Sequence, residues 1–199
     1  KKISAGGLEE TLPPEFANYE SAFTVAGEAL QAGITLFEDK DLENDKVYKI
    51  DTEGNGVVVR YKDVKEGRMF VGKCRIRIPW KLLAYEIFEN APNGVEWNEN
   101  LKSVKRLHQI TANVDIMHTT TNDVFIIKSR DFLIVRAKRE INGSFLLVAK
   151  SITLPEAPET KDSVRGICHL GVSRVTPDNA DPEACFYEYV SLMDLKGMM

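Results

Sequence analysis

From residue 47 onward, short segments in which apolar and polar residues alternate dominate the chain. β-branched and aromatic residues are enriched in these segments, and turns that contain glycine, asparagine or proline separate them. The connections are too short for the crossover helices that parallel neighbours require. This pattern favours an antiparallel sheet over a parallel one, and it constrains the fold more than any other feature of the sequence.

Nine segments follow this pattern. They comprise residues 47–51, 57–61, 69–78, 103–110, 114–120, 131–139, 144–152, 164–172 and 185–193. In the third segment, Phe70 and Cys74 alternate with Lys73 and Arg75, so one face of that strand should be buried and the other exposed. With the helical segments described next, the pattern predicts an α+β domain with an antiparallel sheet of about nine strands.

Two segments have helical periodicity instead. Between Glu15 and Phe37, apolar residues recur every three or four positions, which predicts an amphipathic helix. Pro79 begins a second such segment, which extends to Phe88, and proline is common at the first position of a helix. Residues 97–101 are expected to form a further short helical turn.

The first 14 residues differ from the rest of the chain. They are polar, contain two glycines and end in Pro13-Pro14. We therefore expect residues 1–14 to be a linker or tail. A chain of 199 residues suits one domain better than two, so residues 15–199 are predicted to fold as a single domain.

The composition excludes some classes of function. The chain has 26 basic and 30 acidic residues and a formal net charge of −4, whereas a nucleic-acid binder needs a basic surplus. Its longest apolar run, residues 145–149, is far shorter than the ~20 residues that span a bilayer. The start, in which Lys1-Lys2 is soon followed by Ser4, Ala5 and Gly6, does not resemble a secretory signal. We therefore expect a soluble globular domain without a nucleic-acid partner.

Cys74, Cys168 and Cys185 are three in number and widely spaced. A disulfide framework would be even and denser, and a zinc site would show closely spaced pairs. We therefore expect three free thiols in a reducing compartment, and hence a cytoplasmic protein.

No catalytic motif accompanies the histidines His108, His118 and His169. The sequence lacks HExxH, GxSxG, Walker and GxGxxG patterns. His118 follows Asp115 by three positions in a predicted strand, which places the two on opposite faces. Cys168 is adjacent to His169, and these also point apart, so no nucleophile–base pair is predicted. We expect no enzymatic activity, no cofactor and no metal.

Arg136 is the most unusual residue of the predicted strands. The segment around it is apolar on both faces, so the guanidinium should be buried, and it must then find acceptors. Two interpretations remain open. Arg136 either forms a structural salt bridge with a core carboxylate, or it is a polar anchor in an apolar cavity that orients a ligand with one hydroxyl or carbonyl group.

A set of residues distributed over most of the chain recurs in one family's order and spacing. It comprises Tyr19, Gly27, Glu28, Ala29, Gly67, Phe70, Pro79, Trp97, Asn98, Ser129, Arg130, Asp131, Phe132, Arg136, Val164, Arg165, Gly166 and the final Asp194-Leu195-Lys196-Gly197. This set resembles the StAR-related lipid transfer (START) domain family. It is most similar to the sterol-binding branch, which contains the steroidogenic acute regulatory protein and its late-endosomal membrane-anchored relative.

The resemblance implies a helix-grip fold, in which a curved antiparallel sheet wraps around a long C-terminal helix and encloses a tunnel for one lipid. It implies non-enzymatic extraction of a lipid from one membrane and its release at another. It also implies that the segment between Thr119 and Ser129 gates entry. In the sterol-binding branch, Arg136 corresponds to a cavity arginine that pairs with an acidic residue of the neighbouring strand.

This sequence departs from that pattern at the acidic position. Allowing one gap, the position falls on His118, and without the gap on Met117. Alternation favours His118, because it shares the apolar face with Val114 and Ile116. The predicted lipid-contacting residues are Arg136, His118, Phe132, Ile134, Met117, Tyr189 and Ser191.

A second departure concerns the C-terminal helix that closes the tunnel in the family. The sequence stops at Met199, so we expect this lid helix to be missing. Residues 185–193 would then border an open apolar groove, with weak ligand retention or self-association as the consequence.

The resulting prediction is a non-enzymatic carrier of one lipid, a sterol such as cholesterol. It would be a monomer that contacts membranes transiently, free in the cytoplasm or as the cytosolic domain of a membrane-anchored protein. Because His118 cannot neutralise Arg136, another apolar ligand with a polar end, such as a carotenoid or fatty acid, stays open. Two further functions also stay open, namely a ligand-regulated interaction module and a remote enzyme of the helix-grip superfamily.

Overall fold

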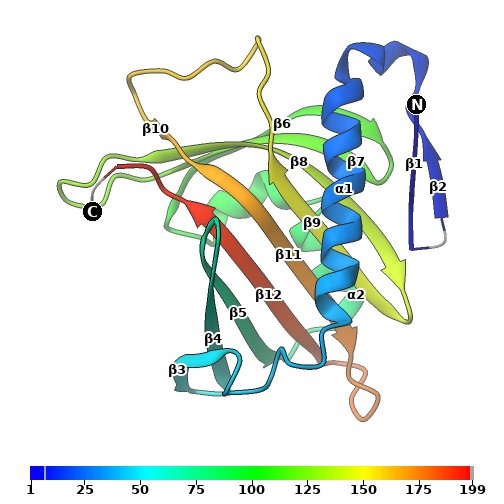
Figure 1. The fold of residues 1–199 in the computed structure, drawn as a ribbon, viewed down its shortest axis with the longest axis vertical. Coiled ribbons are helices and arrows are strands. Elements are labelled where there is room, and N and C mark those ends of the chain that lie inside the picture. Colours follow the sequence, from blue (N-terminus) through cyan, green and yellow to red (C-terminus); the bar gives the residue numbers. More distant parts are fainter. Residues whose placement is uncertain (7, 198–199) are drawn as a thin grey trace.

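A curved sheet forms the body of the protein in the computed structural model, which describes residues 1–6 and 8–197 (Figure 1). Its ten strands include nine in the order β3-β4-β5-β12-β11-β9-β8-β7-β6, all antiparallel to their neighbours, and β10, which pairs in parallel with β8. Their bounds are β3 (Lys49–Gly54), β4 (Val57–Val64), β5 (Gly67–Ile76), β6 (Leu101–Thr111), β7 (Val114–Thr121), β8 (Arg130–Ile141), β9 (Ser144–Ser151), β10 (Val164–Arg165), β11 (Ile167–Pro177) and β12 (Cys185–Asp194). The predicted α+β class and antiparallel sheet are confirmed.

The strand order places β12 in the middle of the sheet. β12 pairs with β5 on one side and with β11 on the other, so it joins the meander β3–β5 to the strands β6–β11. The segment predicted as one strand over residues 164–172 is divided at Gly166, where β10 ends and β11 follows.

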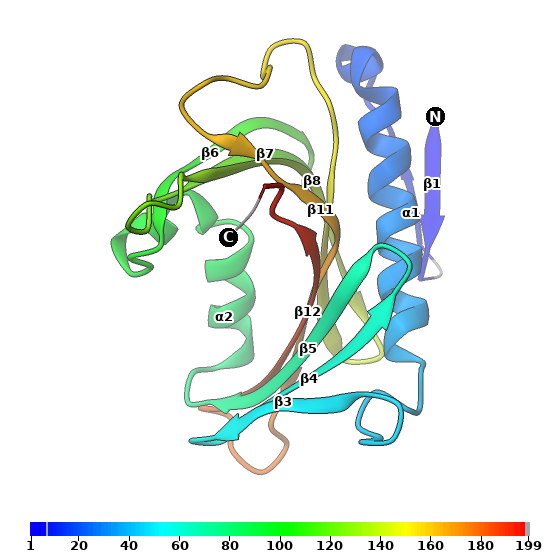
Figure 2. The same ribbon diagram turned by 60° about the vertical axis from the view of Figure 1, so that its left-hand side comes forward.

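The longer helices lie on opposite sides of this sheet (Figure 2). α1 (Glu20–Phe37) follows the short 3-10 helix η1 (Pro14–Tyr19) and covers the convex face. α2 (Trp80–Ile87) lies within the concave face, and the 3-10 helix η2 (Ala91–Glu96) follows it. The helical turn predicted over residues 97–101 is wrong, because η2 precedes this segment and β6 already begins at Leu101.

The main hydrophobic core lies between α1 and the convex face. It combines buried side chains of one helix face with the alternate positions of the central strands that point the same way. The largest fully buried ones include Phe23, Leu30, Ile116, Leu133, Val135, Val148 and Val172. Gly33 allows α1 to approach closely, since a methyl group there would lie 2.8 Å from Val148. A smaller core packs Ala84 and Phe88 against the concave face.

Residues 1–14 do not form the predicted linker or tail. β1 (Lys2–Ala5) and β2 (Leu8–Thr11) pair as an antiparallel hairpin, and Ile3, Ala5 and Leu12 are buried in the main core. Gly27 of α1 accommodates this hairpin, because a methyl group there would lie 2.7 Å from Ile3. No helix among the described residues is both long enough and apolar enough to cross a membrane.

A cavity on the concave face: the candidate lipid site

One row across the concave face runs from Arg136 through three small residues, Ala149, Gly171 and Ser191. Arg136 of β8 lies opposite Ala149 of β9, Ala149 opposite Gly171 of β11, and Gly171 opposite Ser191 of β12. Side chains of this size fill little of the space above the sheet. Two residues before Ala149 on β9, the same face carries the larger side chain of Leu147. The strand register therefore creates a hollow that ends at Arg136.

A cavity of about 170 Å³, which we call the deep cavity, lies over this row. Most of its wall is apolar, and Arg136 is its only charged lining residue among the part of the chain that the structure describes. The lining residues are Thr119, Phe132, Ile134, Arg136, Leu147, Ala149, Cys168, Gly171, Ser173, Tyr189 and Met193. An apolar wall with a few polar groups is typical of sites for small apolar ligands.

Two further cavities adjoin the deep cavity. The helix cavity, of about 210 Å³, lies beneath α2 and shares Thr119, Ile134 and Arg136 with it. The loop cavity, of about 320 Å³, shares Phe132 and extends to Val124 and Lys128 in the β7–β8 loop (residues 122–129). Together the three cavities fall within the ~300–1,000 Å³ that ligand sites commonly occupy.

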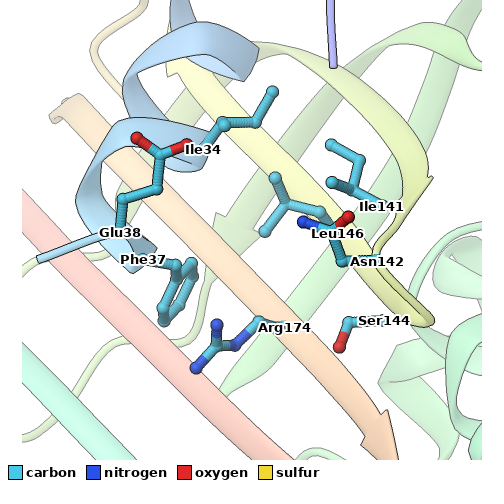
Figure 3. Close-up of a pocket in the computed structure, with 8 residues that line it drawn as sticks. All are labelled: Ile34, Phe37, Glu38, Ile141, Asn142, Ser144, Leu146 and Arg174. Carbon is cyan, nitrogen blue, oxygen red and sulfur yellow. The ribbon is translucent and has the colours of Figure 1, made fainter. Parts of the chain in front are cut away.

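Other hollows of the surface have a different character. A pocket of about 170 Å³ on the convex side lies between the end of α1 and the β8–β9 turn (Figure 3). There the Arg174 guanidinium lies 4.1 Å from the centre of the Phe37 ring and pairs with Glu188. A wide groove beneath the β9–β10 loop (residues 152–163) is lined by that loop and by Lys196.

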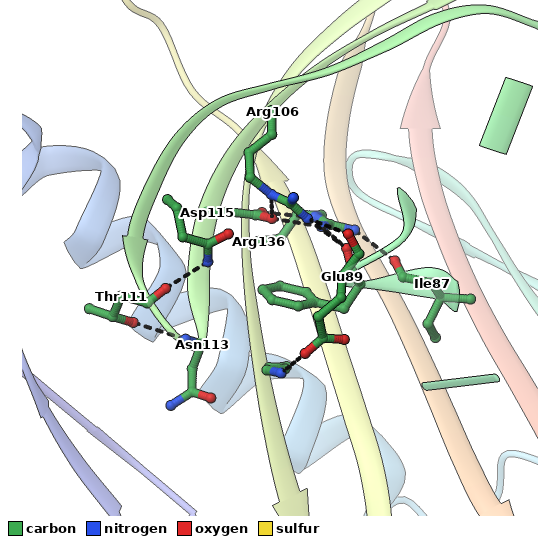
Figure 4. Close-up of polar contacts among 10 residues, drawn as sticks. Ile87, Glu89, Arg106, Thr111, Asn113, Asp115 and Arg136 are labelled. Carbon is green, nitrogen blue, oxygen red and sulfur yellow. Dashed lines mark hydrogen bonds and ion pairs between the residues drawn. The ribbon is translucent and has the colours of Figure 1, made fainter. Parts of the chain in front are cut away.

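Arg136 pairs with Asp115, which lies directly opposite it on β7 (Figure 4). Its Nε donates to Asp115 Oδ1 at 2.9 Å, and its Nη2 donates to Oδ2 at 2.7 Å. Arg106 of β6 also donates to Asp115 Oδ2, at 3.0 Å. The Asp115 side chain is fully buried, with 0% of its surface exposed. The Asp115 carboxylate thus accepts hydrogen bonds from two guanidinium groups.

Both arginines also hold the end of α2. Arg136 donates from Nη1 to the Ile87 carbonyl at 2.8 Å and from Nη2 to the Phe88 carbonyl at 3.0 Å. Arg106 donates from Nη2 to the carbonyls of Phe88 and Glu89. These carbonyls have no partners within the helix, and cations are favoured at a helix C-terminus. The cluster of Arg106, Asp115 and Arg136, which we call the arginine cluster, therefore anchors α2 over the cavities.

The predicted placement of His118 beside Arg136 is wrong. His118 lies opposite Leu133 in the β7–β8 register and so points to the face opposite Arg136. Its Nε2 lies 2.7 Å from Oδ2 of the buried Asp131. The acidic partner of Arg136 is Asp115, three positions before His118, because alternation puts Asp115, Met117 and Thr119 on the concave side.

Asp131 joins His118 to the β9–β10 loop. Arg165 donates from Nε to Asp131 Oδ2 at 2.8 Å, and Ser163 donates to Oδ1 at 2.9 Å. Arg165 also donates to the carbonyls of Ala157 and Pro158 in that loop. Burial alone would raise the pKa of Asp131, but the hydrogen bonds from His118, Arg165 and Ser163 outweigh it and hold the pKa below its usual value of 3.8.

The three consecutive side chains of Arg130, Asp131 and Phe132 contact three different parts of the protein. Arg130 donates from Nε to the Leu195 carbonyl and from Nη2 to the Lys196 carbonyl, each at 2.9 Å. Asp131 holds the β9–β10 loop, and Phe132 lines both the deep cavity and the loop cavity. The Arg-Asp-Phe motif and the distant Asp-Leu-Lys-Gly motif are therefore in direct contact.

Most of the predicted site residues share the concave face. Phe132, Ile134, Arg136 and Tyr189 line the deep cavity, and Met117 lines the helix cavity. Ser191 lies in the row of small residues beneath the deep cavity. Sequence reasoning missed Asp115, Thr119, Cys168 and Gly171; the alternation within residues 114–120 could have indicated Thr119, since it shares a face with Met117.

Hydroxyl and thiol groups complete the deep cavity. The Tyr187 and Tyr189 rings stack with their centres 6.4 Å apart, and the Tyr187 hydroxyl lies 3.1 Å from Ser173 Oγ. Burial raises the pKa of Tyr189, and it raises the pKa of the Cys168 thiol to about 12. These groups are therefore neutral near pH 7. Among the described residues, no cluster of three His, Cys, Asp or Glu side chains could hold a metal ion.

A curved antiparallel sheet with an apolar cavity on its concave face is typical of the helix-grip class of domains. The START domain model matches residues 35–199, so the chain belongs to the START domain family. The resemblance inferred from the sequence is thereby confirmed.

Named relatives agree with this assignment. Steroidogenic acute regulatory-like protein 1 of Caenorhabditis elegans is 30% identical over 194 residues, which cover 96% of this chain and 75% of the relative. The mitochondrial steroidogenic acute regulatory protein of Danio rerio is 28% identical over 173 residues, which cover 85% of this chain and 59% of the relative. The chain thus spans only part of each relative's length.

Solved structures show the same fold. Human StAR-related lipid transfer protein 5 superposes with a TM-score of 0.79 at 20% identity, covering 91% of this chain and 86% of that one. Human STARD10 superposes with a TM-score of 0.74 at 17% identity, covering 85% and 69%. At such identities the likeness concerns the fold alone.

Proposed function

We propose that this domain binds one lipid molecule, a sterol such as cholesterol, and carries it between membranes. The deep cavity is the observation that carries this proposal, because it combines an apolar wall with one charged group, Arg136. Burying apolar surface is worth ~25 cal/mol per Å², so such a cavity retains a rigid apolar body that water excludes. The names of the curated relatives, which refer to steroidogenesis, support a sterol.

The three adjoining cavities suggest how the ligand lies. Its polar end would be next to Arg136 and the hydroxyl groups of Thr119 and Ser173 in the deep cavity. The apolar body would extend past Phe132 into the loop cavity, whose outer wall is the β7–β8 loop. Entry would then require movement of that loop, as the family resemblance suggests.

In the proposed role the domain transports the lipid and does not catalyse a reaction on it. Cys168 is a thiol that lines the deep cavity, but burial raises its pKa to about 12, so little thiolate is present near neutral pH. Its thiol hydrogen-bonds to the Ala149 carbonyl at 3.6 Å rather than to a base. An incubation of the domain with a cholesteryl ester should yield no hydrolysis product; product that disappears in Cys168→Ala would contradict this role.

The tip of the β7–β8 loop supports contact with membranes. Phe125 and Ile126 are each 100% exposed, and Val124 beside them is half exposed. Trp97, at the edge of the helix cavity, is 65% exposed, and Asn122 ties its segment to the loop by donating to the Glu99 carbonyl. Exposed apolar side chains around a cavity entrance favour insertion into the interfacial region of a bilayer.

Membrane contact can be tested with vesicles of phosphatidylcholine and phosphatidylserine. The double change Phe125→Asp and Ile126→Asp should reduce co-sedimentation and slow lipid transfer, since both side chains leave water in the bound state. Ile50→Asp, an exposed position on the edge strand β3, is the matched control and should bind like the unaltered chain. Equal vesicle binding by all three proteins would show that this loop does not contribute to membrane contact.

Ligand identity requires a direct experiment. Organic extraction of the purified domain followed by mass spectrometry should yield a sterol, whereas a carotenoid or a fatty acid would redirect the proposal to that ligand. Transfer of fluorescent sterol from donor to acceptor vesicles then tests carriage. Tight binding without transfer would favour a ligand-regulated interaction module instead.

The row of small residues provides a matched pair of variants. Gly171→Val places branched carbon atoms in the deep cavity, although a Cβ there meets nothing closer than 3.5 Å. It should lower sterol affinity by about tenfold or more, as expected for overpacking. A Cβ at Gly54 on β3 meets no atom within 4 Å, so Gly54→Val is the control. Equal affinities would show that the ligand does not occupy the deep cavity.

We also propose a reducing compartment, the cytoplasm, as the site of action of a monomeric domain. Cys74, Cys168 and Cys185 are free thiols, as expected where thiols stay reduced. Size-exclusion chromatography with light scattering tests the oligomeric state, and microscopy of the tagged protein tests the location.

A further inference from the structure

We infer that the deep cavity selects a lipid whose buried end is a hydrogen-bond acceptor, and that it prefers an anionic end to a neutral hydroxyl. The arginine cluster carries this inference, which rests on the proposed lipid-binding function and specifies the chemistry of the ligand's polar end. A sterol bearing a sulfate or carboxylate group would fit better than the corresponding sterol alcohol.

Both carboxylate oxygens of Asp115 already accept hydrogen bonds from the arginines of the cluster. Asp115 Oδ1 accepts from Arg136, and Oδ2 accepts from both Arg136 and Arg106. Because the Asp115 side chain is fully buried behind the guanidinium groups, a ligand hydroxyl cannot donate to it. An ion pair of one arginine and one exposed carboxylate could both donate a hydrogen bond to a ligand hydroxyl and accept one from it. The arginine cluster has no exposed carboxylate that could accept one.

Donors remain at the cavity wall. A guanidinium has five N–H groups, and four of those of Arg136 have acceptors among the described residues. The remaining N–H group is on Nη1, and Arg136 lines both the deep cavity and the helix cavity, so this is the donor that we assign to a ligand there. Thr119 and Ser173 offer hydroxyl groups that can also donate.

The net charge of the arginine cluster also favours an anionic ligand end. Two guanidinium groups and one carboxylate leave one positive charge uncompensated, and the carbonyl dipoles of α2 offset only part of it. Glu86 lines the helix cavity, where Asn90 donates to its carboxylate, and it does not line the deep cavity. The nearby Lys138 and Glu89 pair with each other. A charge-assisted bond in this poorly solvated place is stronger than a neutral one.

The test compares cholesterol with cholesterol sulfate, which share one sterol body. We expect the unaltered domain to bind cholesterol sulfate about tenfold more tightly in a fluorescent-sterol displacement assay, a difference of one charge-assisted hydrogen bond. Arg106→Gln removes the surplus charge and should reduce the preference to about threefold or less, whereas Arg106→Lys should keep it. Arg75→Gln is the control, since Arg75 pairs with Asp178 and Asp181 outside the cavities.

Each outcome has a distinct meaning. If the unaltered domain binds neither sterol, the proposed function fails. If it binds both equally, or cholesterol more tightly, the proposed function stands and the inference about the polar end is overturned. A preference that survives in Arg106→Gln also overturns the assignment to the cluster, provided that circular dichroism shows a folded variant. A preference lost in Arg106→Gln but kept in Arg106→Lys and Arg75→Gln supports it.

Discussion

A methyl group on Gly166, at the junction of β10 and β11, would lie 2.4 Å from the Phe132 ring. Gly166 borders the groove beneath the β9–β10 loop, and Phe132 lines the deep cavity, so the two residues form the partition between these spaces. The absence of a side chain at Gly166 therefore leaves the space that the Phe132 ring occupies.

Gly166→Ala should push the Phe132 ring into the deep cavity. We expect sterol affinity to fall about tenfold and stability to fall by ~1–3 kcal/mol, the usual cost of overpacking. Titration with a fluorescent sterol and urea unfolding measure the two effects. The double variant with Phe132→Leu should recover much of the affinity, because the smaller side chain can yield; additive losses would contradict the contact.

Arg136→Leu should destabilise the fold as well as alter the cavity. It removes four hydrogen bonds and leaves the buried Asp115 with Arg106 as its remaining charged partner. We expect a loss of ~3–5 kcal/mol in urea unfolding, as for other broken buried ion pairs. Arg75→Leu disrupts a solvent-exposed pair and should change the stability far less. A stable Arg136→Leu variant with weakened sterol binding would instead favour a pure ligand anchor.

Asp131 should make stability depend on pH in the acid range. Its pKa lies below the usual 3.8 in the folded state, so its contribution is fully present above that value and is lost as the pH falls through the folded pKa. The difference in unfolding free energy between the unaltered chain and Asp131→Asn should be largest near neutral pH and shrink below about pH 4. A difference that is constant from pH 7 to about pH 3 would show that the carboxylate charge is not the cause.

Cys168 should report on occupancy of the deep cavity. Burial raises the pKa of its thiol to about 12, so alkylation by iodoacetamide at about pH 8 should be slow. Saturation with sterol should slow it further. Cys74 is only partly buried and does not line the deep cavity, so its labelling, followed by peptide mass spectrometry, is the internal control. Equal rates at Cys168 with and without sterol would place the ligand elsewhere.

Patterns within a single element were predictable from the sequence. Apolar residues on both faces of residues 131–139 predicted the two-sided burial of β8, and the helical repeat up to Phe37 predicted α1. The β1–β2 hairpin was not predictable in this way, since its strands have four residues each and their burial depends on contacts of Ile3 and Leu12 with the distant core. Tertiary packing, rather than local propensity, orders this segment.

The partner of Arg136 depended on information that one strand does not contain. Asp115 and Arg136 belong to strands joined by the β7–β8 loop, whose length leaves several registers possible. A shift of one residue would turn every side chain of β7 to the other face and exchange Asp115 for a neighbour. The same register aligns Arg136, Ala149 and Gly171. The site is therefore a property of paired strands, and resemblance to a family located Arg136 without locating Asp115.

The central position of β12 has a consequence for how the chain acquires its structure. During synthesis, β5 emerges long before β12, yet Cys185 of β12 pairs with Ile76 of β5. Until then the edges of β5 and β11 that will receive β12 are unpaired, and such edges can pair with other chains. Contacts between segments this distant in sequence make folding slow. The nascent chain thus passes through a prolonged, aggregation-prone stage in which one late strand completes the sheet.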